Sequence, residues 1–145
     1  MKTLILAAAL ALTTAMAHAA DHEIKMLNFG EEGGMVFEPG FLKAAPGDTV
    51  TFVPTNSGHW VKGLIQPEGS ATLESKIDET YTVTLTEEGV YVYSCPPHMM
   101  MSMVGVIQVG AATNMAEVRE KAPGQARRMF QNKGRLDKYL AQVEE

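Results

Sequence analysis

Short stretches in which apolar and polar residues alternate constrain the fold of this chain most. Residues 49–53 read Thr-Val-Thr-Phe-Val, and residues 81–86 alternate in the same way, with Tyr81, Val83 and Leu85 on one face. A period of two is typical of a strand that has one buried face. Glycine, proline and acidic residues separate these stretches and mark turns. The pattern predicts an all-β, antiparallel sandwich of short strands.

Further strands extend this predicted β domain over residues 20–112. Ile24 and Met26 share a face within residues 22–27, and residues 35–37 form a short apolar segment. The last two strands of the domain are predicted at residues 90–94 and 104–109.

Residues 113–145 have a different composition and predict a helical appendage on the same domain. Alanine and charged residues increase there, and β-branched residues become rare. Asn114, or the threonine before it, can cap a helix that ends near Lys121, where Pro123 and the glycine after it interrupt it. A second helix is predicted from about residue 123 to 143, although Gly134 weakens it. Its apolar stripe consists of Met129, Leu136, Leu140 and Val143, with Ala126 and Phe130 beside it.

Most of the basic residues of the C-terminal half lie in this appendage. A solvated helix face is the ordinary interpretation of such a group, and a docking patch is the alternative. The residues are Lys121, Arg127, Arg128, Lys133, Arg135 and Lys138.

The first 19 residues have the pattern of a secretory signal peptide. Lys2 precedes an apolar run at residues 4–12, and Ala17-His18-Ala19 is a small-x-small cleavage site. The apolar run is short for a membrane span, so an uncleaved anchor is the less favoured interpretation. We therefore expect an exported protein without a membrane span, which in a bacterium means the periplasm.

The overall composition excludes several classes of protein. With 17 acidic and 12 basic residues, the chain has a formal charge of -5 and no basic tract, which argues against a general nucleic-acid binder. Apolar residues make up 46% and charged residues 20%, unlike a disordered chain. The single cysteine excludes an intramolecular disulfide and a cysteine-only zinc site. A lone thiol in an oxidising compartment must be buried, metal-bound or chemically active.

Residues 95–103 read Cys-Pro-Pro-His-Met-Met-Met-Ser-Met and connect two predicted strands. Cys95, His98 and Met103 can converge from this one loop, and His59, which follows another strand, can complete the group. Two imidazoles and a thiolate with a weak axial thioether describe an electron-transfer copper site. Thiolate and thioether stabilise Cu(I), whereas imidazole suits both oxidation states, so the sequence favours copper.

Other interpretations of the same residues are open. Taken singly, Cys95 is most often a buried small hydrophobe, and a lone histidine is more often a loop residue. Zinc also accepts cysteine and histidine, but it has no use for a thioether. Nucleophilic catalysis by Cys95 with His98 is disfavoured, since two prolines separate them and no acidic or amide side chain lies nearby in the loop.

Motifs along nearly the whole chain after the leader resemble the cupredoxins, and among them the pseudoazurins. The Cys-x₂-His-x₄-Met spacing fits pseudoazurin or plastocyanin, and the C-terminal helices favour pseudoazurin. The resembling segments are Met26-Leu27-Asn28, Met35-Val36-Phe37-Glu38-Pro39, Pro46-Gly47-Asp48-Thr49-Val50-Thr51-Phe52, Gly58-His59, Pro67-Glu68-Gly69, Ser75-Lys76-Ile77, Cys95-x-Pro97-His98 and Met101-x-Met103.

The resemblance implies a cupredoxin-like Greek-key sandwich or barrel of about eight strands, followed by the two helices. It implies one type 1 copper ion bound by His59, Cys95, His98 and Met103, with Asn28 and Met101 close to it. The protein would be a monomer without enzymatic activity of its own. It would carry single electrons to a periplasmic reductase that docks at the His98 face.

Copper nitrite reductase is the partner that this resemblance favours, and cytochrome c peroxidase or nitrous oxide reductase are alternatives. A copper trafficking or storage protein is an alternative of another class, because the methionines at positions 99, 100, 101 and 103 can bind Cu(I) through thioethers alone.

The chain departs from the resembling family around the expected docking face. Phe29, Ser57 and Ser94 stand where the family usually has lysines, although Lys62 and Lys76 remain in the neighbourhood. Trp60 and Met99-Met100 also replace familiar residues. We therefore expect a docking face that is less cationic and more apolar, formed by Met35, Pro39, Pro97, Met99 and Met100.

Overall fold

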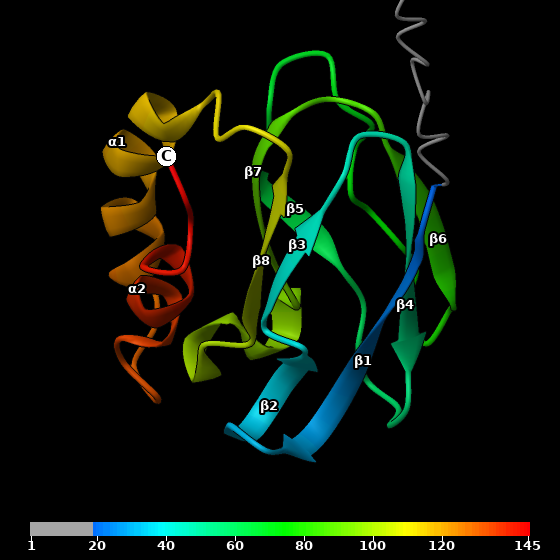
Figure 1. Ribbon diagram of the computed structural model, residues 1–145. Helices are drawn as coiled ribbons and strands as arrows, with labels where there is room; N and C mark the ends of the chain where they lie inside the picture. Colours follow the sequence, from blue (N-terminus) through cyan, green and yellow to red (C-terminus); the bar gives the residue numbers. More distant parts are fainter. Residues whose placement is uncertain (1–18) are drawn as a thin grey trace, which may run out of the picture.

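The chain folds into two four-stranded sheets that pack face to face, and the computed structural model describes residues 19–145 (Figure 1). The first sheet has the order β2-β1-β4-β6, with β1 (Asp21–Gly30), β2 (Gly33–Glu38), β4 (Asp48–Pro54) and β6 (Tyr81–Leu85). The second has the order β3-β8-β7-β5, with β3 (Phe41–Ala44), β8 (Val104–Val109), β7 (Gly89–Ser94) and β5 (Lys62–Ile65). The predicted sandwich of about eight strands is confirmed. The predicted signal peptide lies outside the described residues, except for Ala19.

Two strand pairs correct the expectation of a purely antiparallel sandwich. β1 pairs with β4 in parallel, and β3 pairs with β8 in parallel. The chain passes from β2 in one sheet to β3 in the other across Pro39 and Gly40 without reversing (Figure 1). β4 therefore re-enters the first sheet in the direction of β1. β3 and β5 were not predicted, because four residues are too few to establish a period.

The core between the sheets is built from the faces that the alternating pattern predicted. Ile24, Met26, Val83 and Leu85 are buried, and Tyr81 is half-buried against them. β7 and β8 are buried along their whole length, so they show no alternation in burial. Strands that are covered on both faces have this character.

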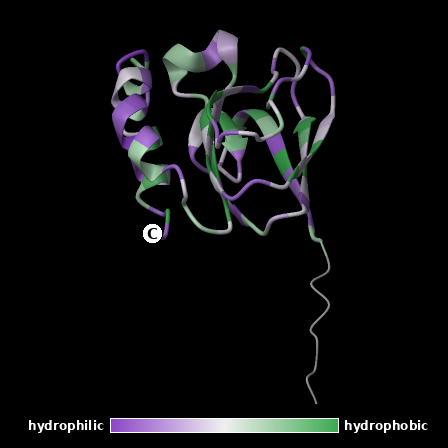
Figure 2. Cartoon of the chain, turned by 90° about the horizontal axis from the view of Figure 1, so that it is seen from above, coloured by the Kyte–Doolittle hydropathy of each residue, from purple (hydrophilic) through white to green (hydrophobic). Residues whose placement is uncertain are grey.

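Two helices cover the outer face of the second sheet. α1 (Met115–Ala126) and α2 (Arg135–Leu140) lie along one side of the sandwich, next to β7 and β8 (Figure 1). Both hydrophobic and hydrophilic residues occur on them, as expected for helices with one packed face (Figure 2). Val90 and Val92 pack against this layer, whereas Tyr91 and Tyr93 point into the sandwich core. No helix within residues 19–145 has both the length and the apolar character needed to cross a bilayer.

The predicted boundaries of the helices were wrong. α1 continues through Pro123 and Gly124 to Ala126, and α2 begins only after Gly134, whose φ of 87° ends any continuous helix there. Pro123 is tolerated because it is exposed and lies in the last turn, so the carbonyl that loses its helical donor remains accessible to water.

The predicted apolar stripe is confirmed, with one correction. Met129 and Leu136 are buried, and Leu140 and Val143 pack against the same cluster. Phe130 is 60% exposed, because it lies in the connection between the helices.

Among the basic residues of the appendage, Arg135 is only 6% exposed and does not belong to a solvated face. The other basic residues of that group are exposed, as predicted: Lys121, Arg127, Arg128, Lys133 and Lys138.

Asp48 connects Ala20 and His22 to the start of β4 through hydrogen bonds. Its buried carboxylate accepts hydrogen bonds from the backbone N–H of Ala20 at 2.8 Å, the backbone N–H of Ala45 at 2.9 Å and His22 Nε2 at 2.8 Å. These bonds, led by the one from Ala45, lower the pKa of Asp48 from 3.8 to about 2. The ionised carboxylate therefore stabilises the folded state.

We predict that Asp48→Asn lowers the free energy of unfolding at pH 7 by about 1–3 kcal/mol, since an amide cannot accept all three bonds. The folded pKa of Asp48 is depressed, so its contribution is complete above pH 3.8 and is lost as the pH falls through about 2. Urea unfolding of both proteins at pH 7 and in this acid range measures the difference. A difference that does not shrink with acidification would show that the carboxylate charge is not involved.

Candidate metal centre

The loop between β7 and β8 places the predicted ligands at one end of the sandwich. Cys95 has an extended backbone and precedes the short 3₁₀ helix η1 (Pro96–Met101), which begins with two prolines. The amide of His98 donates to the Cys95 carbonyl at 3.0 Å, which folds the histidine back towards the cysteine. The amide of Met103 donates to the His98 carbonyl at 3.2 Å, and the amide of Cys95 donates to the Met103 carbonyl at 2.9 Å. Residues 95–103 therefore form a closed loop.

Three of the four predicted ligands converge on one point. The ligand atoms of His59, Cys95 and His98 all lie within 4.8 Å of one another. Cys95 Sγ is 3.7 Å from His59 Nδ1 and 3.5 Å from His98 Nδ1, and the two imidazole rings are 4.9 Å apart between centroids. Both histidines thus present the same ring nitrogen to the sulfur.

The three side chains differ in their access to solvent. His59 and Cys95 are completely buried, whereas His98 is partly exposed. His98 therefore lies at the surface, as expected for the residue at the docking face, and His59 is shielded from solvent.

A hydrogen bond fixes the orientation of the His59 ring. His59 Nε2 donates to Asn28 Oδ1 at 2.9 Å. The backbone N–H of Asn28 in turn donates to Asn56 Oδ1 at 2.8 Å. Because Nε2 carries the proton, Nδ1 keeps a free lone pair towards Cys95. Asp78 Oδ1 accepts from the backbone amides of Gly58 and His59 at 2.6 and 3.2 Å and anchors this turn.

Burial keeps the metal-free donors neutral. Desolvation, followed by the neighbouring His98, lowers the pKa of His59, and desolvation also lowers the pKa of His98. Desolvation raises the pKa of the Cys95 thiol to about 11, although hydrogen bonds from the backbone amides of Trp60 and His98 act in the opposite direction. His59, His98 and Cys95 would hold a metal cation through two neutral imidazoles and one thiolate, and binding would release the thiol proton. Trp60 acts here through its backbone.

The four methionines of the loop lie in different environments. Met103 is buried beside Cys95 in the core between the sheets, and Met99 is buried in the cluster beneath the helices. Met100 is 60% exposed, and Met101 is half-buried. The expectation that Met99 contributes to an exposed docking face is therefore wrong, because its side chain packs against the sheet.

One expected feature of the docking face is also changed. Ser94 is only 2% exposed, so this position adds no polar group to the surface, whereas Ser57 and Phe29 are exposed. Sequence reasoning missed Asp78, which belongs to no motif, and assigned Arg135 to the wrong environment.

The donor set fits copper. Two imidazole nitrogens and one thiolate are the trigonal set of an electron-transfer copper site. The cluster of described metal-binding side chains includes no carboxylate and no second cysteine that would complete a structural zinc site. His59, Cys95 and His98 therefore form a candidate copper site.

Comparison with known proteins agrees with this geometry. Residues 24–110 match the family model described as "Copper binding proteins, plastocyanin/azurin family". The chain is 48% identical to a pseudoazurin from Paracoccus pantotrophus, over 94% of this chain and 93% of the relative. It is 47% identical to a putative pseudoazurin from Rhizobium leguminosarum, over 97% and 91%.

Solved structures extend the similarity to the fold. The crystal structure of native pseudoazurin from Hyphomicrobium denitrificans superposes with a TM-score of 0.72 at 34% sequence identity, covering 86% of this chain and 99% of that one. The chain therefore belongs to the pseudoazurins, a group of copper-binding electron carriers within the plastocyanin/azurin family.

Proposed function

We propose that this protein is a periplasmic one-electron carrier in which His59, Cys95, His98 and Met103 bind one type 1 copper ion. The cluster of two imidazole nitrogens around the buried Cys95 sulfur carries this proposal. Met103 supports it as the fourth ligand, since it is buried in the same core and its backbone is bonded to Cys95 and His98.

The protein frame suits a rapid change of oxidation state. Copper supplies the redox couple when it is bound. The closed loop and the hydrogen bond from His59 to Asn28 hold the donor groups in place. The protein around a bound copper ion would therefore move little when the ion gains or loses an electron. His59 is shielded from water, whereas His98 offers an imidazole edge at the surface for the electron to leave or enter.

The surface around His98 is apolar. Pro97 and Met100 are exposed next to it in η1, and the Phe130 amide donates to the Met100 carbonyl at 2.9 Å, which places an exposed aromatic residue beside them. Phe29, which is 80% exposed, follows the asparagine that orients His59. A face of this kind suits a transient redox complex that releases quickly.

We infer that the partner is a periplasmic reductase, with copper nitrite reductase as the first candidate. Cytochrome c peroxidase and nitrous oxide reductase are compatible with the same site. A lysine-rich face would attract a partner through acidic residues on that partner. The apolar face around His98 favours a partner whose association depends less on such charges.

Copper trafficking through the methionines is less well supported. Met99 and Met103 are buried in different clusters on opposite faces of the sheet, and Met100 is exposed. Their sulfurs therefore do not share one accessible site. A carrier that retains its ion is the better interpretation of this arrangement.

We predict that the copper(II) protein is blue, because thiolate-to-copper charge transfer absorbs visible light. Cys95→Ser should abolish the colour, whereas Met103→Leu should keep it and raise the reduction potential, since it removes only a weak donor. Visible and EPR spectra with cyclic voltammetry measure these properties. Met100→Leu is the matched control and should leave both unchanged. A colourless wild-type protein that retains zinc instead would contradict the proposal.

We predict a weak dependence of electron transfer on ionic strength. The rate constant with copper nitrite reductase should change less than about threefold between about 20 and 200 mM salt, because steering by exposed charges is minor. Stopped-flow absorbance measures this rate. Phe130→Glu should slow transfer, and Thr82→Glu, on an exposed β6 position, should not. A steep salt dependence, or equal effects of both variants, would contradict docking at the apolar face.

We predict export with cleavage after Ala19. The new amino group of Ala20 would then occupy the position from which its nitrogen donates to Asp48 at 2.8 Å. The intact mass of protein from a periplasmic fraction measures the cleavage site. Ala19→Phe should block cleavage, since the site requires a small residue. Full-length protein in the cytoplasm would contradict the export proposal.

A further inference from the structure

Arg135 is a buried cation whose position no functional role yet explains. Its side chain is 6% exposed, and all its hydrogen-bond acceptors are backbone carbonyls. Among the described residues no carboxylate forms a salt bridge with it. A buried charge is costly unless hydrogen bonds compensate it, so this arrangement needs several acceptors at once.

The acceptors of Arg135 belong to two segments that flank the metal centre. Nη1 donates to Ser102 O at 2.9 Å, Met35 O at 2.9 Å and Met101 O at 3.5 Å. Nη2 donates to Glu32 O at 3.0 Å and Gly34 O at 3.2 Å. The first segment is the end of the loop formed by residues 95–103, and the second comprises the residue before β2 and the first residues of that strand. One guanidinium therefore joins α2 to both.

The carboxylate of Glu32 complements this charge without forming a salt bridge with Arg135. Glu32 accepts from Tyr139 Oη at 2.8 Å and pairs with Lys138 Nζ at 3.1 Å. Desolvation opposes ionisation of Glu32, but these two partners outweigh it, and the pKa of Glu32 lies below its ordinary value. The positive charge of Arg135 also favours the ionised form of Glu32.

The connection between α1 and α2 also forms hydrogen bonds with the end of η1. The amides of Phe130 and Gln131 donate to Met100 O at 2.9 and 3.0 Å, and Asn132 Nδ2 donates to Met101 O at 3.2 Å. The buried Ser102 hydroxyl donates to Gln131 O at 2.6 Å. The bonds to Met100 O and Met101 O satisfy carbonyls at the end of η1 that have no helical donor.

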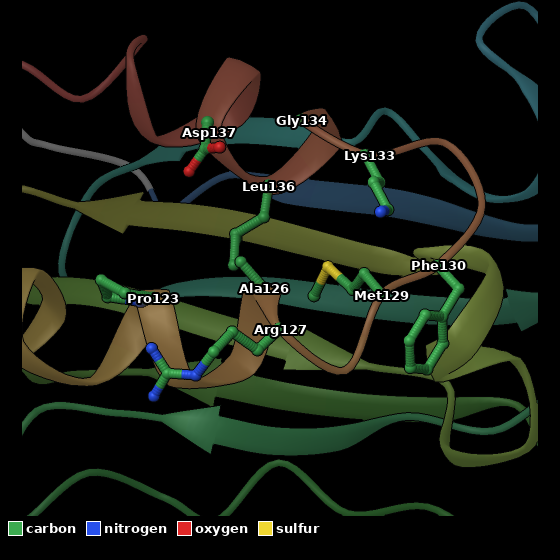
Figure 3. A pocket seen from close by; sticks show the side chains of 9 residues that line it. All are labelled: Pro123, Ala126, Arg127, Met129, Phe130, Lys133, Gly134, Leu136 and Asp137. Carbon is green, nitrogen blue, oxygen red and sulfur yellow. The ribbon is translucent and has the colours of Figure 1, made fainter.

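Packing supports this connection from the side of the sheet. A groove of about 550 Å³ separates the two helices, and Figure 3 shows Met129 and Leu136 directed towards each other at its base, with Phe130 beside η1. Both side chains are buried. The connection that carries the amides of Phe130 and Gln131 is therefore anchored by packing at both ends.

Arg135 holds the peptide group that precedes Met103. The carbonyl of this peptide belongs to Ser102 and accepts from Arg135, and its N–H belongs to Met103 and donates to His98 O. Ser102 has φ 60° and ψ 38°, a left-handed conformation that a serine adopts only under constraint. Both sides of the peptide plane are therefore held, and with them the direction in which the Met103 side chain leaves the backbone.

We propose that Arg135 is a positioning residue for Met103, and that the helical appendage sets how firmly the thioether meets the copper ion. This inference rests on the proposed role of Met103. Lysine is a poor replacement, because three donors on one nitrogen cannot reach two separate sets of carbonyls.

The test compares four proteins loaded with copper(II): wild type, Arg135→Met, Met103→Leu and the double variant. Visible and EPR spectra of Arg135→Met should shift towards those of Met103→Leu, and its copper(I) affinity should fall about 10-fold. In the Met103→Leu background, Arg135→Met should add no further spectral change. Arg127→Met, an exposed arginine on the same connection, is the matched control and should match wild type.

Each other outcome has a definite meaning. If Arg135→Met has the wild-type spectrum and affinity and only unfolds more easily, Arg135 is structural and the inference fails. If its spectral change persists undiminished in the Met103→Leu background, the effect does not pass through Met103 and the inference also fails. If Arg135→Met does not fold, Arg135→Lys is compared in the same way. A wild-type protein that is not blue overturns the proposed function itself, which is a different failure.

Discussion

The hydrogen bond from the Cys95 amide to the Met103 carbonyl closes the ligand loop where β7 and β8 end. Since these strands are antiparallel neighbours, the last residues of one and the first of the other are already side by side. The loop needs only to turn back once, and the two prolines of η1 restrict how it can do so. The convergence of Cys95 with the two histidines depends on this closure, as does the burial that keeps the thiol out of contact with water.

The sequence predicted that His59, Cys95 and His98 would lie together, because thiol and imidazole side chains are rare in this chain and two of the three share one short loop. Cys95, His98 and Met103 share one loop, and the histidine at position 59 needs only the sandwich to bring it near. The structure confirmed the three-residue cluster. The strands that alternate were also predicted, whereas β3 and β5 were too short to give a period and the parallel pairs depend on how the chain changes sheets.

The features that sequence reasoning missed depend on tertiary contacts. Arg135 has the sequence context of a surface helix residue, and only the fold brings five carbonyls around it. Met99 belongs to a loop that pattern analysis treats as exposed, yet the helices cover it. Burial by a distant segment leaves no local signal, so neither residue could be assigned correctly before the structure was known.

The helices and the sheet they cover also constrain each other's evolution. Val90, Val92, Val104 and Val106 form an apolar outer face that is buried only because α1 and α2 lie on it. A descendant that lost residues after position 112 would expose this whole face to water, and restoring solubility would require polar substitutions at several positions together. The appendage is therefore retained in such a lineage by the composition of two β-strands, independently of any selection on copper.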